Sequence, residues 1–329
     1  MSRKTLNQLY AEHTGKVSDK WSLYLTEYDR LFDDYGDKQV RLLEIGVQNG
    51  GSLEIWSKYF SNASALIGCD INPDCARLIY DDPRIGVIVG DANTLDTSEQ
   101  VFNRCSQFDI IIDDGSHLSS DIIKSFALYF PRVVEGGVFI AEDLHCSYWD
   151  QFEGGLFDPY SSISFFKSLA DIINHEHWGI PKARADILGG IFTKYGCEID
   201  AEELSQVHSV EFINSMCVVR KAPAADNGLG HRVIAGSIEL VVPGHRELHD
   251  HPYQLDPIFD QSSNPRTARA IPPGEAIQHT ELLLADAQRK ITSLNQALDE
   301  RDGQIATLLA SISWRVTAPL RKFLAVFRR

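Results

Sequence analysis

The chain has 329 residues, of which 43% are hydrophobic and 23% are charged, an ordinary composition for a globular protein. Its formal net charge of −15 repels polyanions and argues against a nucleic-acid partner. The six cysteines form no CxxC pair, which favours reduced thiols over a disulfide framework. The N-terminal residues carry no apolar signal segment, and no apolar run is long enough to cross a bilayer, so we expect a cytoplasmic protein.

Residues 1–38 are predicted to form a helical N-terminal segment. Trp21, Tyr24 and Tyr28 share one face of a helix there. These aromatic side chains either form a lid over a cofactor or pack against the rest of the domain.

From residue 39 onward, short apolar runs alternate with segments of helical character. The predicted strands are QVRLLEIGV, ALIGCDI, RIGVIVGD, FDIIIDD and GGVFIAED, and the helices between them are GSLEIWSKYF, PDCARLIYDD, TSEQVFNRCSQ and SSDIIKSFALYFPRVV. After a helix at 163–178, a pair of strands at 185–195 and 210–221 completes the sheet. Apolar strands separated by helices predict a parallel sheet covered on both faces. We therefore expect a doubly wound α/β domain at 39–221, with a mostly parallel seven-stranded sheet.

The composition changes after residue 221. Residues 222–276 are rich in Pro, Gly, Asn and Ser, which predicts a loosely folded connector. Apolar residues then recur every seven positions, at Ile277, Leu284, Ile291, Leu298, Ile305 and Ile312, with Ala287, Leu294 and Leu308 three positions later. This spacing predicts a coiled coil over 277–312, and with it a homo-oligomer. The alternative is one amphipathic helix that packs on its own domain.

The last 17 residues, SWRVTAPLRKFLAVFRR, contain five basic residues and no acidic one. Apolar side chains alternate with these cations, which predicts a basic amphipathic tail over 313–329. Such a tail suits peripheral contact with an anionic inner-membrane surface, or docking on a partner such as a glycosyltransferase. The ending resembles the SWRxTxPLR segment that follows coiled coils in bacterial surface-polysaccharide enzymes.

Four successive predicted strands each end in a carboxylate. The residues are Glu44, Asp70, Asp91 and the pair Asp113 and Asp114. Helix capping explains any one of them but explains the whole set poorly. Ligands of doubly wound domains bind at this edge of the sheet. So many carboxylates disfavour a phosphate-rich cofactor and favour a cationic, phosphate-free nucleoside such as S-adenosylmethionine.

The first strand leads into a glycine-rich turn, EIGVQNGGS, at residues 44–52. Glycines allow a backbone to approach a ligand closely at a helix N-terminus. At the second strand end, Asp70 is expected to accept hydrogen bonds from ribose hydroxyls. The expected cofactor-binding residues are Glu44, Gly46, Asn49, Gly50, Ser52, Asp70, Asp91 and Asp113.

The stretches LLEIGVQNGGSLEIWSKYF and FDIIIDDGSHLSSDIIKSFALYFPRVVEGGVFIAEDLHCSYW resemble class I S-adenosylmethionine-dependent methyltransferases. Within that class they are most similar to the metal-dependent sugar O-methyltransferases of macrolide tailoring, and the resemblance covers residues 1–221. It implies a Rossmann-like fold, Mg²⁺ ligands at Asp114, Glu142 and Asp143, and His117 as general base. Hard oxygen ligands suit Mg²⁺, and a metal-bound hydroxyl becomes more acidic. Helix capping is the alternative role of these side chains.

His145, Tyr148 and Trp149 follow the acidic pair, and their rings either stack on a sugar or pack beneath a loop. We expect a Mg²⁺-dependent O-methyltransferase that acts on a sugar hydroxyl, with His117 and Asp114 as the catalytic residues. The basic tail directs the expected substrate toward cell-surface polysaccharide such as O-antigen. The alternatives are a macrolide or other natural-product sugar, a different reaction on the same cofactor fold, and a non-catalytic coiled-coil scaffold for glycan assembly.

Overall fold

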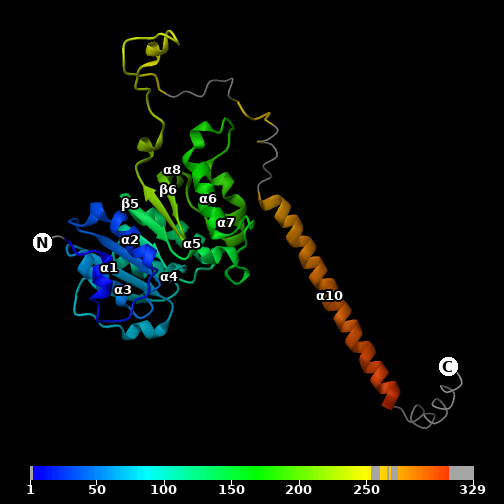
Figure 1. The fold of residues 1–329 in the computed structure, drawn as a ribbon. Helices are drawn as coiled ribbons and strands as arrows, with labels where there is room; N and C mark the ends of the chain where they lie inside the picture. Colours follow the sequence, from blue (N-terminus) through cyan, green and yellow to red (C-terminus); the bar gives the residue numbers. More distant parts are fainter. Residues whose placement is uncertain (1–2, 253–259, 265–266, 268–272, 311–329) are drawn as a thin grey trace, which may run out of the picture. The chain divides into compact units, whose positions relative to one another are not determined.

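The protein's structure, a computed structural model, describes residues 3–252, 260–264, 267 and 273–310. The chain divides into two compact units, residues 1–272 and 273–329 (Figure 1). Each unit is described below by itself.

A seven-stranded sheet organises the first unit, with the strand order β3-β2-β1-β4-β5-β7-β6. The strands are β1 (Arg41–Ile45), β2 (Ala65–Asp70), β3 (Ile85–Val89), β4 (Phe108–Asp113), β5 (Val133–Ala141), β6 (Val207–Ile213) and β7 (Met216–Lys221). The pairs from β3 to β5 are parallel, and β7 pairs antiparallel with both β5 and β6. The prediction of a doubly wound, mostly parallel sheet that ends at residue 221 is therefore confirmed.

Helices cover both faces of this sheet. The α-helices of the unit are α1 (Leu6–Ala11), α2 (Ser22–Leu31), α3 (Gly51–Tyr59), α4 (Leu95–Arg104), α5 (Ser119–Tyr129), α6 (Ser162–Ile173), α7 (Gly189–Tyr195) and α8 (Ala201–Ser205). Three of these helices have a side-chain N-cap, since the side chains of Thr5, Thr94 and Ser161 each accept a backbone N–H of the first turn. Short polar residues thus fix where the helices start.

One face of the sheet is covered by α1, α2 and α3. Their aromatic side chains join sheet residues such as Leu42 and Ile110 in a single buried cluster. Trp56 of α3 makes an edge-to-face contact with Tyr28 of α2, with 5.4 Å between ring centroids. The N-terminal segment is therefore part of the core of the domain.

The opposite face is covered by α5 and α6. Phe126 of α5 lies between Phe139 of β5 and Phe165 of α6, with ring centroids 5.2 and 5.3 Å away. All three side chains are fully buried. Burial of such large rings supplies much of the hydrophobic stabilisation of this layer.

The prediction of a strand at 185–195 is wrong, because this segment is helical. It forms a 3-10 turn, η7 (Arg184–Ile187), followed by α7, and Gly196 ends the helix in a left-handed conformation. Leu188, Ile191 and Phe192 are buried at helical spacing, a period that the strand assignment overlooked.

The remaining strand pair comes from one predicted strand. The segment 210–221 contains a two-residue turn, since Ile213 pairs with Met216, and it forms the hairpin of β6 and β7. Ser215 in this turn adopts a positive φ of 68°. The predicted helix at PDCARLIYDD is shorter than expected, a 3-10 helix η2 (Pro73–Arg77).

A 38-residue helix, α10 (Pro273–Ala310), is the described part of the second unit. A C-terminal helix is thus confirmed, and its pairing into a coiled coil stays a prediction. Ile312 and the basic tail lie outside the described residues. Between β7 and residue 252 the chain contains two short 3-10 helices, η8 (Ala224–Asn227) and η9 (His245–Leu248). Among the described helices, none has the length and apolarity needed to span a membrane.

Replacing Phe126 with alanine is expected to lower the free energy of unfolding by about 3–5 kcal/mol, because it leaves a cavity between α5, β5 and α6. Phe157→Ala is the matched control: Phe157 is 90% exposed, so its loss is expected to change stability by less than about 0.5 kcal/mol. Urea denaturation of both variants measures the difference. Equal losses would contradict the packing described here.

Candidate functional site

A cavity of about 560 Å³ opens at the carboxyl ends of the parallel strands. Backbone hydrogen bonds continue past the strand ends, from Asp114 N to Ile45 O at 2.8 Å and from Glu142 N to Asp113 O at 2.9 Å. This continuation holds the carboxylates that follow β4 and β5 side by side. The cavity volume lies within the range of small-molecule and cofactor sites.

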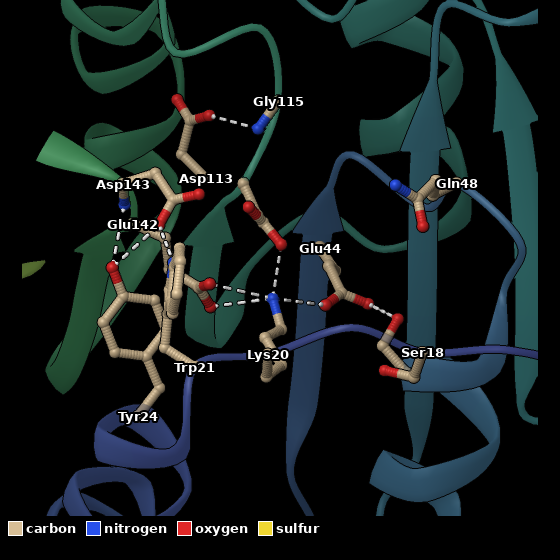
Figure 2. A network of polar contacts seen from close by, with 12 residues as sticks. Ser18, Lys20, Trp21, Tyr24, Glu44, Gln48, Asp113, Gly115, Glu142 and Asp143 are labelled. Carbon is tan, nitrogen blue, oxygen red and sulfur yellow. Dashed lines mark hydrogen bonds and ion pairs between the residues drawn. The ribbon is translucent and has the colours of Figure 1, made fainter. Parts of the chain in front are cut away.

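Lys20 lies at the centre of this acidic group (Figure 2). Its side chain is only 3% exposed, and its Nζ lies 2.5 Å from Asp114 Oδ2, 2.8 Å from Glu142 Oε1 and 3.5 Å from Glu44 Oε1. Tyr28 also donates its hydroxyl to Glu142. One ammonium from the N-terminal segment thus pairs with carboxylates from three strand ends.

Asp143 is held by a second set of donors from the N-terminal segment. Trp21 Nε1 and the Tyr24 hydroxyl each lie 2.9 Å from Asp143 Oδ1, and both contacts are drawn in Figure 2. Asp143 adopts a left-handed backbone conformation with φ 53°, and His117 does so with φ 58°. Such backbone strain in residues other than glycine is concentrated at functional sites.

Burial controls the electrostatics of the group. It raises the pKa of Glu142, an effect that Lys20 opposes, and it raises the pKa of Asp113 to about 6. Burial acts to lower the pKa of Lys20, but Glu142, Asp114 and Glu44 outweigh it and raise this pKa well above its usual value. The ammonium is therefore charged at any physiological pH.

Asp114, His117 and Asp143 lie close enough together to hold a metal ion. One ligand atom from each lies within 4.8 Å of the others, and all three side chains line the cavity. His117 Nε2 is 3.7 Å from Asp143 Oδ2, and His117 Nδ1 has no hydrogen-bond partner among the described residues. Two carboxylates and an imidazole are donors that divalent cations accept. Glu142 also lines the cavity but is bonded to Lys20 and Tyr28.

The structure brings most of the expected cofactor-binding residues to the cavity wall. Gly46, Ser52, Asp70, Asp91 and Asp113 line it, whereas Glu44, Asn49 and Gly50 do not. Glu44 is fully buried and accepts a hydrogen bond from the Ser52 hydroxyl at 2.5 Å.

Three aspartates are positioned at the cavity wall in different ways. Asp70 accepts the backbone N–H groups of Val47 and Gln48, both at 2.8 Å, and thereby fastens the glycine-rich turn to the end of β2. Asp91 accepts the N–H of Asn93 at 2.9 Å, a turn contact two residues along the chain, and the N-cap of α4 is Thr94 instead. Asp113 is buried, and its Oδ2 has no hydrogen-bond partner among the described residues. Asp113 therefore keeps one buried carboxylate oxygen that makes no hydrogen bond among the described residues.

A row of rings borders Asp143. His145 contacts Trp21 and Trp149, with ring centroids 6.1 and 5.1 Å apart. Phe152 continues the row toward His117 at 6.5 Å. Tyr148 and Trp149 are 41% and 45% exposed, so these two rings are not buried core residues. Trp21 belongs to this row, whereas the sequence suggested for it either a lid over a cofactor or packing against the domain.

The comparisons with known proteins agree with this geometry. Residues 43–144 match a protein family described as a methyltransferase domain. With the strand order and the cavity at the strand ends, this match defines a Rossmann-like class I methyltransferase fold. The resemblance seen in the sequence is thereby confirmed at the level of the fold.

Two curated relatives are named as O-methyltransferases. The chain is 39% identical over 164 residues to mycinamicin VI 2''-O-methyltransferase of Micromonospora griseorubida, an alignment that covers 46% of this chain and 40% of that protein. It is 34% identical over 189 residues to demethylmacrocin O-methyltransferase of Streptomyces fradiae, which covers 53% and 46%. The chain thus spans less than half the length of either relative.

Solved structures of MycE methyltransferase from the mycinamycin biosynthetic pathway are similar as well. The complex with Mg and SAH superposes with a TM-score of 0.57 at 28% identity, and covers 69% of this chain and 57% of that one. The complex that also contains mycinamycin VI gives a TM-score of 0.54 at 27% identity, with the same coverage.

Gly46→Ala is expected to disrupt the cavity wall. A Cβ at Gly46, where φ is +89°, would lie 2.0 Å from the Asp114 carbonyl oxygen, so both strain and a backbone clash follow. We expect the free energy of unfolding to fall by about 2–5 kcal/mol. Gly136→Ala, where φ is +79° but nothing lies within 4 Å, is expected to cost only about 1–2 kcal/mol. Denaturation curves that show equal losses would exclude the clash.

Proposed function

We propose that the protein is a divalent-metal-dependent S-adenosylmethionine O-methyltransferase that acts on a sugar hydroxyl. The observation that carries the proposal is the convergence of Asp114, His117 and Asp143 at the edge of a methyltransferase fold. The relatives named as O-methyltransferases and the MycE complex with Mg and SAH support the same assignment.

The cavity suits a cationic nucleoside cofactor. Asp113 contributes a buried carboxylate oxygen that makes no hydrogen bond among the described residues, and Gly46 keeps the adjoining turn close to the β4 loop. Asp70 holds the glycine-rich turn in place through two backbone N–H groups. Uncompensated carboxylates favour a positively charged ligand over a phosphate-bearing one.

Asp114, Asp143 and either His117 or Glu142 would hold a divalent ion. When bound, S-adenosylmethionine supplies the methyl group and the ion makes a nearby hydroxyl more acidic. In the preferred assignment His117 is the general base, since its side chain lines the cavity and its Nε2 lies 3.7 Å from Asp143 Oδ2. Trp21 and Tyr24 fix the orientation of Asp143 through their hydrogen bonds.

His117→Ala is expected to lower the rate of methyl transfer by about 10²- to 10⁴-fold, because the proton acceptor is removed. Calorimetric binding of SAH is expected to persist, since His117 is one residue among many in the cavity wall. His208→Ala is the control, because His208 is exposed and bonded to Asn227 outside the cavity. Transfer of an isotope-labelled methyl group to a glycan acceptor measures the rate. A His117 variant with normal rates would contradict the assignment.

Chelation of divalent ions with EDTA is expected to abolish methyl transfer, and Mg²⁺ is expected to restore it. Persistence of full activity in EDTA would remove the metal from the proposal.

The acceptor is proposed to present a sugar ring to the row formed by Trp21, His145, Trp149 and Phe152, because exposed aromatic faces suit the apolar face of a sugar. Tyr148 lies beside this row in sequence and is half-exposed. The sequence of the basic tail favours a surface polysaccharide such as O-antigen, whereas the relatives named for mycinamicin and macrocin favour a natural-product sugar. Mass spectrometry of glycans and of secreted metabolites from a strain without this protein separates the two, because only the true product class loses a methyl group.

The apolar stripe of α10 is proposed to join copies of this chain in a coiled coil. Leu284, Ile291, Leu294, Leu298 and Ile305 are between 52% and 69% exposed, and they follow the seven-residue spacing. An unpaired stripe of this kind is costly in water. From its sequence, the basic tail is proposed to make peripheral contact with a membrane or with a glycosyltransferase.

Combining Ile291→Asp with Leu298→Asp is expected to dissociate the oligomer, because it places charges at two core positions of the coiled coil. Gln296→Asp, an exposed position on the opposite side of the helix, is the control and is expected to leave the assembly unchanged. Analytical ultracentrifugation of the full chain measures the mass. A monomeric wild-type protein would rule out the coiled coil.

A further inference from the structure

Lys20 is the feature of the site that neither the motifs nor the comparisons assign. It precedes α2, and its ammonium donates to Asp114 Oδ2 at 2.5 Å and to both oxygens of Glu142 at 2.8 and 3.0 Å. The side chain is 3% exposed. A buried lysine is tolerated only when it is paired with acceptors, and here carboxylates from β1, β4 and β5 provide them (Figure 2).

The charges around this ammonium do not balance. Glu44, Asp114 and Glu142 all lie within 3.5 Å of Lys20 Nζ, and the carboxylate of Asp143 borders the same cavity. Burial raises the pKa of Glu142 to about 8, but Asp114 and Asp143 alone still outnumber the ammonium, and the group retains an attraction for further cations.

Two partners of Lys20 belong to the acidic set expected to bind the metal. Asp114 Oδ2 and both Glu142 oxygens point to the ammonium, so a divalent ion on these side chains would have to share or replace those contacts. A divalent ion close to the ammonium would also be repelled by it. Asp143 is bonded to Trp21 and Tyr24, and in the described part of the chain it forms no ion pair with Lys20.

We propose that Lys20 is a positioning residue that sets the affinity of the site for divalent cations by competing with them for Asp114 and Glu142. This inference rests on the proposed metal-dependent function. Without a divalent ion the ammonium neutralises part of the negative charge of the acidic group and holds Asp114 and Glu142 close together. When the ion is bound, the metal compensates part of the negative charge that the ammonium otherwise compensates.

Titration calorimetry of the full chain with MgCl₂ tests the proposal. Lys20→Met is expected to lower the Kd for Mg²⁺ by about tenfold or more, because the competing charge is gone and Glu142 is released. Lys16→Met is the matched control: Lys16 lies in the same segment, but its ammonium pairs with Glu54, 2.7 Å away, which does not line the cavity. It changes the net charge equally and is expected to leave the Kd unchanged.

Thermal unfolding with and without Mg²⁺ gives a second readout. Without the ion, Lys20→Met is expected to melt at a lower temperature than the wild type, and Mg²⁺ is expected to raise its melting temperature more than that of the wild type. If Lys20 had a purely structural role, its replacement would lower the melting temperature, and Mg²⁺ would not restore it. Lys20→Gln, which keeps a hydrogen-bond donor without the charge, carries the same test if Lys20→Met does not fold.

The outcomes separate the two proposals. An equal or higher Kd for Mg²⁺ in the Lys20 variants overturns the role of Lys20 alone. Absence of Mg²⁺ binding in the wild type and in both variants overturns the metal-dependent function as well. If both variants stay unfolded even in Mg²⁺, the ion cannot take over from the ammonium, and the competition is excluded.

Discussion

The collection of negative charge at one edge of the sheet is the constraint on which the rest of the structure depends. Parallel strands end at the same edge, so Glu44, Asp114 and Glu142 are brought together by topology. Such a group is stable only where donors surround it. Ser52 donates to Glu44, Tyr28 donates to Glu142, and Lys20 reaches all three carboxylates. The N-terminal segment supplies two of these three donors.

Packing in the hydrophobic core holds this N-terminal segment beside the site. Tyr28 packs on Phe32 and on Trp56 of α3, with ring centroids 5.1 and 5.4 Å away. These buried rings anchor α2, and Lys20 and Trp21 lie immediately before its first turn. Large apolar contacts on one face of α2 thus position polar atoms at its N-terminal end. The same helix serves both packing and electrostatics, so substitutions in its core face also displace the acidic site.

The sequence was most informative where local pattern and topology coincide. The apolar runs located the five parallel strands, and the carboxylates after them predicted the edge at which the cavity opens. Lys20 was not predicted, because its partners Asp114 and Glu142 are 94 and 122 residues away and nothing beside it marks it as special. The 185–195 segment was misassigned because its buried residues follow a helical period within a stretch rich in β-branched and aromatic residues. Long-range pairing and ambiguous short apolar runs are what pattern alone resolves least.

The turn between β6 and β7 contacts residues beside the acidic site, although it comes late in the sequence of the domain. The Ser215 carbonyl accepts the Leu144 N–H at 2.9 Å and the Tyr24 hydroxyl at 3.0 Å, and its side chain lies 2.5 Å from His145 Nδ1. Tyr24 and Ser215 are 191 residues apart in the chain. A growing polypeptide on the ribosome therefore lacks the contacts that hold Tyr24 and His145 beside Asp143 until the last two strands of the sheet have emerged.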